Sequence, residues 1–522
     1  MGEADSLQAK VLDFLGRPQA YAPLPATVER IETHASIVFL AGAFAYKVKR
    51  AVKYNFLDFS TLAKRHAACL NELRVNARTA PQLYLEVVPV TIGENGAFRL
   101  GGDGAPVEWV LTMRRFDQAK LYYRMAGEGR LGLALMPRLA EIIAAFHDSA
   151  DRALSTDQAV WPLEGVLRDN AETFAANAAI FPPQAARALD DAMRERLAAL
   201  APLLKARAHG GYVRHCHGDL HLRNIVEIDG APVLFDAIEF DDLLATIDVL
   251  YDLAFLLMDL GKRGLGPHAN AVLNAYLDAA AGTGNLVGLA TLPLFLPMRA
   301  TIRAKVELLR ASFAAGGQGE ATREEARAYF ALARDFLDPA AARLIAIGGL
   351  SGTGKSAVAR AIAPHLGGFP GAVHVRSDVE RKRLFGAAPL QRLPAEAYTP
   401  EVTERVYAMC RKRALMALEG GQAVILDAVH ARTEEREALA ALAADKGVPF
   451  SGLWLEAPAE ILRDRIAART ADVSDATAAV VDVQRGYAIG PQTFHVIDAN
   501  RPLDQVAASC LERIGIKPRA AS

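Results

Sequence analysis

Residues 349–356 read Gly349-Leu350-Ser351-Gly352-Thr353-Gly354-Lys355-Ser356. They match the pattern G-x-x-x-x-G-K-S/T at every fixed position and follow an apolar run, residues 344–347, that predicts a buried strand. In this pattern the glycines let backbone N–H groups wrap a phosphate, the lysine reaches the terminal phosphates, and the hydroxyl can bind Mg²⁺. We therefore expect this loop to bind ATP through Gly349, Ser351, Gly352, Thr353, Gly354, Lys355 and Ser356.

A second signature of phosphate transfer lies upstream, in His217-Gly218-Asp219-Leu220-His221-Leu222-Arg223-Asn224. Asp219 precedes Asn224 by the interval that separates base from metal ligand in the catalytic loop of protein kinases. The following residues predict a hairpin with its turn at Asp229-Gly230, which brings Asp236 beside Asn224. We expect Asn224 and Asp236 to hold Mg²⁺, while Asp219 accepts or orients the proton of an attacking hydroxyl.

From about Ile31 to Leu260 the chain resembles the aminoglycoside phosphotransferase-like kinases, with His-Gly-Asp in place of the protein-kinase His-Arg-Asp. This resemblance implies that Lys47 is the strand lysine that reaches the ATP phosphates and that Glu72 is its helix partner. Lys49 lies on the same strand face and is the alternative to Lys47. Residues 33–36, Thr-His-Ala-Ser, stand where protein kinases have a glycine-rich loop, so the cover over the nucleotide should differ.

The chain of 522 residues is long enough for two or three domains. Its first part predicts strands and a helix over residues 37–77, another strand at 107–113, and alanine-rich helices at 131–147 and 183–208. A flexible break is expected at residues 314–320, a helix at 323–337, and a domain boundary near Asp338-Pro339. Strand-like runs at 344–347, 372–375, 423–426, 452–455 and 493–497 then alternate with helices, which is typical of a parallel sheet.

The predicted fold is therefore an α+β bilobal kinase-like domain, residues 1–340, followed by an α/β P-loop domain with a mainly parallel sheet, residues 341–522.

In the second half, Asp378 follows the second predicted strand, where P-loop kinases that phosphorylate hydroxyl groups place the residue that activates the acceptor. Arg381 comes three residues later, so a helix would put both on one face, with Arg381 binding substrate. A helix N-cap is the simpler alternative for Asp378. Asp427 ends another strand and is suited to the Mg²⁺ site. Ala428 follows it where many ATPases have an acidic residue to activate water, and this favours transfer to a substrate over hydrolysis.

Arg465 and Arg469 share a helix face at the i, i+4 spacing and are candidates for lid arginines that neutralise charge on the transferring phosphoryl group. A solvated helical face is the alternative. Residues 343 to 515 resemble the P-loop kinases that include polynucleotide 5′-end kinases, zeta toxins and gluconate kinase. The fusion of the two halves resembles bacterial proteins described as bifunctional aminoglycoside phosphotransferase-like and ATP-binding proteins.

The composition is that of a soluble globular protein: 52% of residues are hydrophobic, 23% are charged, and the formal net charge is -1. The four cysteines are scattered, which argues against zinc or disulfides and suits a reducing cytoplasm. No signal peptide or membrane span is evident, and no basic stripe with interleaved aromatic residues supports nucleic-acid binding. The sequence leaves the oligomeric state and nucleic-acid binding open.

We expect a cytoplasmic phosphotransferase with two ATP·Mg²⁺ sites acting on small hydroxylated acceptors. The alternatives are one active kinase domain regulated by a nucleotide-sensing ATPase module, or a nucleic-acid end kinase in the C-terminal half.

The remaining polar residues near the first site have simpler explanations. His217, His221 and Asp252 are expected to be structural, because a polar loop needs partners for its buried backbone groups. Two groups of charges give conflicting clues to the acceptor: Glu239, Asp241 and Asp242 favour an amine, and Arg299 and Arg303 favour an anion. Exposed loop charge is the expected explanation of both.

Overall fold

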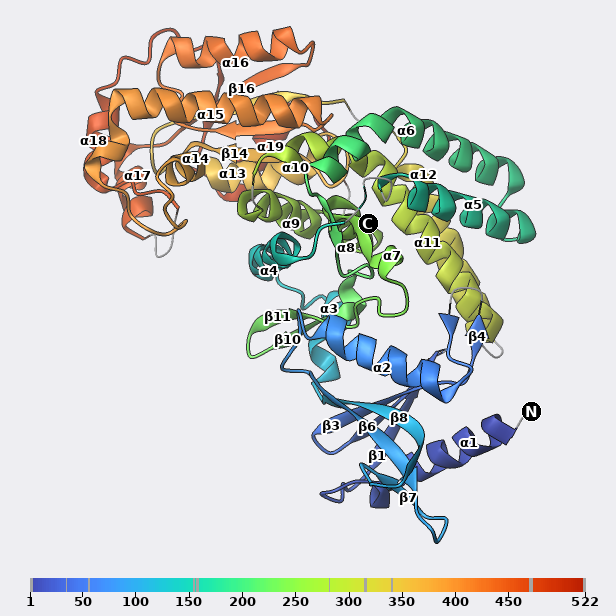
Figure 1. The fold of residues 1–522 in the computed structure, drawn as a ribbon. Helices are drawn as coiled ribbons and strands as arrows, with labels where there is room; N and C mark the ends of the chain where they lie inside the picture. The colour runs from blue at the N-terminus through green and yellow to red at the C-terminus, as the bar shows by residue number, and fades with distance from the viewer. Residues whose placement is uncertain are drawn as a thin grey trace.

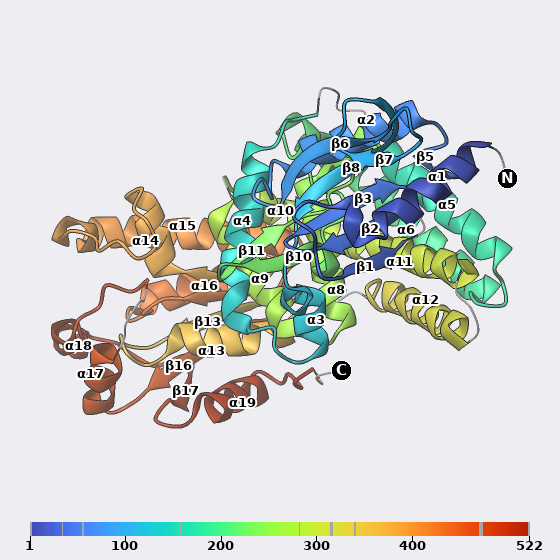
Figure 2. The ribbon, with the colours of Figure 1, turned by 90° about the horizontal axis from the view of Figure 1, so that it is seen from below.

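A computed structural model describes residues 3–33, 35–54, 57–153, 155, 159–280, 282–313, 317–338, 341–468 and 473–519. The sheet-rich first lobe and the α/β P-loop lobe lie at opposite ends of the molecule, with a helical lobe between them (Figure 1). The turned view shows the same separation between the blue sheet and the orange and red P-loop elements (Figure 2).

The first lobe is an antiparallel sheet with strand order β1-β2-β3-β8-β6-β7. Its strands are β1 Val28–Glu32, β2 Ser36–Ala41, β3 Phe44–Lys49, β6 Tyr84–Ile92, β7 Phe98–Leu100 and β8 Ala105–Arg114; the short pair β4 Lys53–Tyr54 and β5 Leu57–Asp58 stands apart. Alternate side chains of a strand point to opposite faces. Tyr46 and Val48 of β3 therefore pack with helix α1 Glu3–Leu15, whereas Lys47 and Lys49 reach Glu72 on helix α2 Leu62–Asn76.

The helical lobe surrounds the predicted catalytic loop. Its helices are α3 Tyr122–Gly127, α4 Met136–Ser149, α5 Trp161–Ala176, α6 Pro183–His209, α7 Asp242–Ala245, α8 Val249–Lys262, α9 Gly266–Ala279, α10 Gly284–Gly288, α11 Leu292–Phe313 and α12 Gly317–Asp335. Strand β9 Val213–His215 pairs with β12 Thr246–Asp248, and the predicted hairpin consists of β10 Ile225–Ile228 and β11 Ala231–Leu234. The stretch Gly284–Ala311 has the length and hydropathy of a membrane span, but 78% of that apolar window is buried inside the protein, as in a core helix.

The P-loop lobe is a five-stranded parallel sheet with order β14-β15-β13-β16-β17. Its strands are β13 Leu344–Gly348, β14 Val373–Arg376, β15 Val424–Asp427, β16 Phe450–Glu456 and β17 His495–Asp498. Its helices are α13 Lys355–Ile362, α14 Ser377–Leu384, α15 Pro400–Glu419, α16 Thr433–Asp445, α17 Ala459–Ala467, α18 Ala478–Arg485 and α19 Leu503–Arg513. The carboxyl ends of β13, β14 and β15 meet at one edge, which is where such sheets bind ligands.

Two expected element boundaries are wrong. Helix α12 begins at Gly317, so the second half of the expected break is helical, and residues 314–316 lie outside the described part. Ion pairs from Glu320 to Arg323 and Arg327 stabilise the start of this helix. The helix expected from residue 131 begins at Met136, after a short 3₁₀ turn.

Candidate functional site

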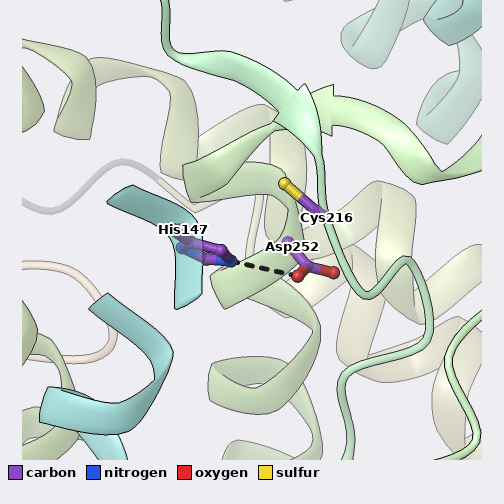
Figure 3. Close-up of side chains that lie close together, drawn as sticks. All are labelled: His147, Cys216 and Asp252. Atoms are coloured by element: carbon purple, nitrogen blue, oxygen red, sulfur yellow. Dashed lines mark hydrogen bonds and ion pairs between the residues drawn. The ribbon is translucent and has the colours of Figure 1, made fainter. Parts of the chain in front are cut away.

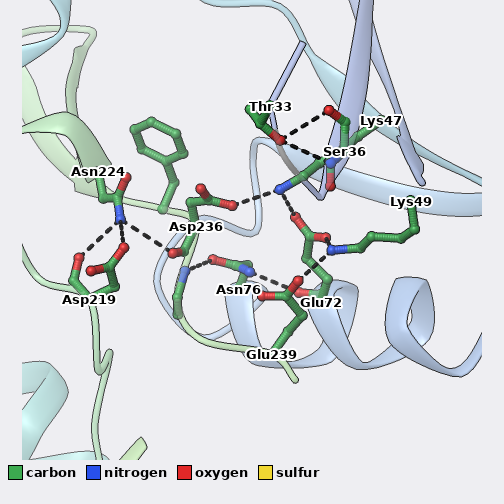
Figure 4. A network of polar contacts seen from close by, with 12 residues as sticks. Thr33, Ser36, Lys47, Lys49, Glu72, Asn76, Asp219, Asn224, Asp236 and Glu239 are labelled. Atoms are coloured by element: carbon green, nitrogen blue, oxygen red, sulfur yellow. Dashed lines mark hydrogen bonds and ion pairs between the residues drawn. The ribbon is translucent and has the colours of Figure 1, made fainter. Parts of the chain in front are cut away.

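The first site is built around a chain of alternating charges that joins β3, α2 and the segment after β11 (Figure 4). The Lys47 ammonium lies 2.7 Å from Glu72 Oε1 and 2.7 Å from Asp236 Oδ1. Burial disfavours the charge on Lys47, but the carboxylates of Asp236, Glu72 and Glu239 outweigh it and raise the lysine pKa. Burial likewise opposes ionisation of Glu72, yet Lys47 and Lys49 lower its pKa to about 2. Both groups are therefore charged at neutral pH.

The two candidate lysines have different surroundings. Lys49 is 1% exposed, lies 2.5 Å from Glu72 Oε2, and also pairs with Glu239. Lys47 lines a cleft of about 370 Å³, together with Asp219 and Asp236, whereas Lys49 does not reach that cleft. Lys47 is thus the lysine placed to meet a ligand, and Lys49 is a buried structural cation.

We expect Lys47→Met and Lys49→Met to separate binding from stability. Lys47→Met should weaken ATP binding at the first site by about tenfold or more, while Glu72 keeps Lys49 as its partner. Lys49→Met should lower the free energy of unfolding by about 3 kcal/mol, because it removes the buried cation that pairs with Glu72 and with the half-buried Glu239. Calorimetric titration with ATP and urea denaturation of both variants measure the two effects. The opposite pattern would exchange the roles of the two lysines.

The catalytic-loop residues come together as the spacing predicts. Asn224 Nδ2 donates to Asp219 Oδ2 at 3.0 Å and to the Asp219 carbonyl at 3.0 Å. The same amide lies 3.5 Å from the carbonyl oxygen of Asp236. Hairpin pairing places Ile225 opposite Leu234, and this returns the chain to Asn224. Asp219, Asn224 and Asp236 are thus brought together, and Asp236 also contacts Lys47.

His221 and the arginine Arg303 act on the charge of Asp219. Burial raises the pKa of the Asp219 carboxyl, but the His221 imidazole, 3.4 Å away, together with Arg303 lowers it well below its usual range. Asp219 is therefore ionised at neutral pH and able to accept a proton. Its side chain is 37% exposed, so a substrate can reach it.

Two supporting residues escaped the sequence analysis. The Tyr84 hydroxyl accepts a hydrogen bond from the Asp236 N–H at 3.0 Å, and Asn76 Oδ1 accepts one from the Ala237 N–H at 2.9 Å. They hold Asp236 in a left-handed conformation, φ 60°, which aims its carboxylate at Lys47. Asn76 lies one helical turn after Glu72, and that spacing was the available signal.

A buried cluster of His147, Cys216 and Asp252 lies beneath the loop, and its ligand-type atoms lie within 4.8 Å of one another (Figure 3). Both nitrogens of His147 are engaged, with Asp252 at 3.1 Å and with the Tyr276 hydroxyl at 2.9 Å. Burial raises the pKa of the Cys216 thiol, which disfavours the thiolate that a metal needs. The cluster is therefore a hydrogen-bonded support. Asp252 accepts from the backbone N–H groups of His217 and Gly218, which fixes the residues that precede Asp219.

The charges that gave conflicting clues to the acceptor mostly have partners within the protein. Arg299 and Arg303 are 5% and 8% exposed, so exposed loop charge is the wrong explanation for them. The Arg299 guanidinium stacks on the Tyr251 ring at 3.8 Å, and Arg303 pairs with Glu307. Among the acidic residues, Glu239 pairs with Lys49, Asp241 caps α7, and Asp242 lies 3.3 Å from Arg74.

The second site begins at the loop between β13 and α13. Gly349 and Gly352 have φ of 137° and 88°, and a Cβ at either would lie 2.6 Å or 2.7 Å from a backbone carbonyl oxygen. Only glycine fits there. Thr353 Oγ1 donates to the Leu350 carbonyl at 2.8 Å, and the Lys355 ammonium donates to the Gly349 carbonyl at 2.8 Å. The left-handed Gly354 precedes Lys355, so the loop has the shape of a phosphate cradle with its lysine at the rim.

Ser356 and Asp427 form the candidate metal position. The Ser356 hydroxyl donates to Asp427 Oδ2 at 2.5 Å, and His374 Nε2 lies 3.2 Å from the same oxygen. Burial raises the pKa of Asp427, but His374, Lys355 and Ser356 lower it to about 2. A hydroxyl and an ionised carboxylate side by side are oxygen ligands of the kind that Mg²⁺ requires. Sequence analysis missed His374, because nothing local shows that its strand neighbours β15.

Asp378 and Arg381 share helix α14 and lie near each other and near Tyr398. Burial raises the pKa of Asp378 more than a hydrogen bond from Ser474 lowers it. A higher pKa makes the carboxylate a better proton acceptor. Arg381 is 7% exposed, donates to the Ala397 carbonyl at 2.5 Å and stacks on Tyr398 at 5.0 Å. In this structure Arg381 holds the segment around Tyr398 to α14. Its expected contact with substrate stays a prediction.

Of the two predicted lid arginines, the structure describes Arg465 but not Arg469. Arg465 donates to the Ala499 carbonyl at 2.9 Å and so packs α17 against the segment after β17. Arg469 lies outside the described residues. Gln484 of α18, which sequence analysis missed, accepts a hydrogen bond from the Ser351 N–H at 2.7 Å. A phosphate bound in the loop would compete for that N–H group.

The buried His430 should make the free energy of unfolding depend on pH. Burial lowers its pKa to about 4, whereas an imidazole in the unfolded chain titrates near pH 6.5, so between those values only the unfolded state binds the proton. Stability should therefore fall as pH falls through this window, by up to about 3 kcal/mol from His430. We expect His430→Asn to reduce the slope of unfolding free energy against pH. His209→Asn, at an exposed helix end, is the control. An unchanged slope in His430→Asn would contradict this assignment.

Two family models match the chain. Residues 55–286 match the model described as "Phosphotransferase enzyme family", and residues 344–491 match the one described as "AAA domain". Among solved structures, a choline/ethanolamine kinase family protein from Mesorhizobium loti superposes with a TM-score of 0.39 and 15% identity, over 64% of this chain and 95% of that chain. The APS kinase CysC of Mycobacterium tuberculosis superposes with a TM-score of 0.27 and 18% identity, over 34% of this chain and 99% of that chain.

Full-length relatives also occur among curated proteins. "Uncharacterized protein Rv2004c" of Mycobacterium tuberculosis is 30% identical over 484 residues, which is 91% of this chain and 93% of that protein. "Uncharacterized protein Mb2027c" of Mycobacterium bovis matches to the same extent. The alignment spans both signatures, so the likeness extends over the two domains together. The chain therefore belongs to the family of these mycobacterial proteins, and it joins a domain of the phosphotransferase enzyme family to a kinase-like P-loop domain.

Proposed function

We propose that this protein is a cytoplasmic, ATP-dependent phosphotransferase with two separate sites, each of which transfers the γ-phosphoryl group to a small hydroxylated acceptor. The observation that carries the proposal is the first site, where Lys47, Asp219 and Asp236 line one cleft of about 370 Å³ with Asn224 hydrogen-bonded to Asp219. That volume lies in the range of small-molecule pockets. The second site supports the proposal through a phosphate loop with left-handed Gly352 and Gly354 and with Asp378 nearby.

In the first site, Lys47 would bind phosphate oxygens and keep Asp236 in place. Asn224 and Asp236 would hold Mg²⁺, which neutralises phosphate charge when bound. Asp219 would accept the proton of the acceptor hydroxyl, and the support from Asp252 would keep its loop fixed. In the second site, Lys355 and the loop N–H groups would bind phosphate, Ser356 and Asp427 would hold Mg²⁺, and Asp378 would accept the proton.

An ATP-consumption screen tests the proposal. The wild type, Asp219→Asn and Asp378→Asn are assayed against sugars, nucleosides, amino alcohols and short RNA. Each active acceptor should lose its signal in one variant only, which assigns it to one domain. A protein that consumes ATP equally with and without every acceptor, in all three forms, would be an ATPase.

A second candidate function is a nucleotide-sensing C-terminal domain that regulates a single active kinase. Two contacts favour it: Arg381 is turned to the Ala397 carbonyl, and Gln484 occupies a phosphate-loop N–H group. Under this alternative, Asp378→Asn should leave all ATP consumption unchanged, while Lys355→Ala should alter the activity of the first domain.

A further inference from the structure

Helix α9 of the helical lobe contacts β14, the edge strand of the P-loop sheet (Figure 1). Strand β14 pairs with β15 on one side only, where the Val373 N–H donates to the Ala423 carbonyl. Ala372, which directly precedes the strand, and His374 within it direct backbone groups to the open side. An edge strand left bare would expose these groups unpaired.

One side chain of α9 takes the place of a further strand. Asn274 Nδ2 donates to the Ala372 carbonyl at 3.1 Å, and Asn274 Oδ1 accepts from the His374 N–H at 2.7 Å. Its amide therefore pairs with both groups as the peptide unit of a neighbouring strand would. Asn270, one turn earlier and 4% exposed, donates to the same Ala372 carbonyl at 3.0 Å.

The backbone group that Asn274 binds belongs to the residue that supports the candidate metal position. His374 is 7% exposed and contacts Asp427, which is 4% exposed and also accepts from Ser356. The path from α9 to the metal position thus runs through a single residue of β14. His374 and Asp427 are buried and Asn274 is half-buried, so water offers little replacement for a lost contact between His374 and Asp427.

One turn further along α9, Asp278 pairs with residues on the side of the second site where the acceptor is expected to bind. Asp278 lies 2.8 Å from Arg376 at the end of β14 and 3.0 Å from Arg383 on α14. Helix α14 also carries Asp378. Residues 270, 274 and 278 follow the i, i+4 spacing, so one stripe of α9 touches the strand and the helix that frame the second site.

We propose that α9 is part of the P-loop site, with Asn274 as a positioning residue that fixes Asp427 through His374. This inference rests on the proposed Mg²⁺-nucleotide function of the second site. The P-loop domain then binds Mg²⁺-nucleotide fully only while it is docked on the kinase-like domain.

Calorimetric titration of the two-domain chain tests the inference, with ATP binding at the first site weakened by Lys47→Met. Each variant is titrated with ATP in the presence of Mg²⁺ and again with EDTA. Asn274→Leu should weaken binding about tenfold with Mg²⁺ and change it by less than about twofold with EDTA, because the loop N–H groups and Lys355 are untouched. His374→Ala should give the same result, and the double variant should be no worse than either single one.

Asn170→Ala is the matched control, since it removes a buried amide that bonds Thr301 within the first domain; it should match the parent in both titrations. If Asn274→Leu does not fold by circular dichroism, Asn274→Ser takes its place with the same expectation. Unchanged affinity with Mg²⁺, or equal losses with Mg²⁺ and EDTA, would overturn the positioning role. A parent that binds no nucleotide at this site would instead overturn the proposed function.

Discussion

Asp219→Asn should reduce phosphoryl transfer by the first domain about 10²- to 10⁴-fold, the usual contribution of a general base, while ATP binding is retained. The carboxylate is ionised and reachable by substrate, and its loss removes the only predicted proton acceptor of that site. The variant keeps the shape of the side chain, and Lys47, Asn224 and Asp236 remain to bind nucleotide. Turnover with an acceptor from the screen, together with ATP titration, separates transfer from binding.

Asp229→Asn is the control for that experiment. Asp229 lies in the neighbouring hairpin turn with φ 51°, a conformation that asparagine tolerates equally well. It should behave as the wild type. Undiminished transfer in Asp219→Asn would remove that residue from the mechanism.

Lys355→Ala should weaken nucleotide binding at the P-loop site by about 100-fold or more, because it removes the lysine of the phosphate loop. Binding at the first site should persist, since Lys47 and Asp236 belong to another domain. Titration with a non-hydrolysable ATP analogue should then report one site lost and one kept.

The surface variant Lys446→Ala, which removes only an exposed pair with Glu419, controls for the change of charge. Loss of both sites in Lys355→Ala would mean that the two phosphate cradles form one composite site.

The sequence predicts those parts of the protein whose structure depends on residues close together in the chain. The phosphate loop specifies its own strand, turn and helix, because the glycines at 349 and 352 must adopt conformations closed to other residues. The kinase-like and P-loop fold classes are confirmed by the two family models. The boundary at residues 340 and 341 stays a prediction.

The features that could not be predicted from the sequence depend on contacts between segments that lie far apart in the chain. His374 supports Asp427 only because β14 lies beside β15, and the order of strands in a parallel sheet is not written in either strand. Asn274 and Gln484 matter through docking of one element on another. Arg381 lies on the expected helix, but its side chain donates a hydrogen bond to the Ala397 carbonyl. The periodicity of the sequence does not predict this contact.

The most direct measurement is the fate of the γ-phosphate, followed with γ-labelled ATP and an acceptor found for each domain. We predict that the wild type transfers label to both acceptors, that Asp219→Asn and Asp378→Asn each lose one transfer, and that the double variant loses both. Label released as inorganic phosphate at an undiminished rate by the double variant, with none on either acceptor, would contradict a two-site phosphotransferase.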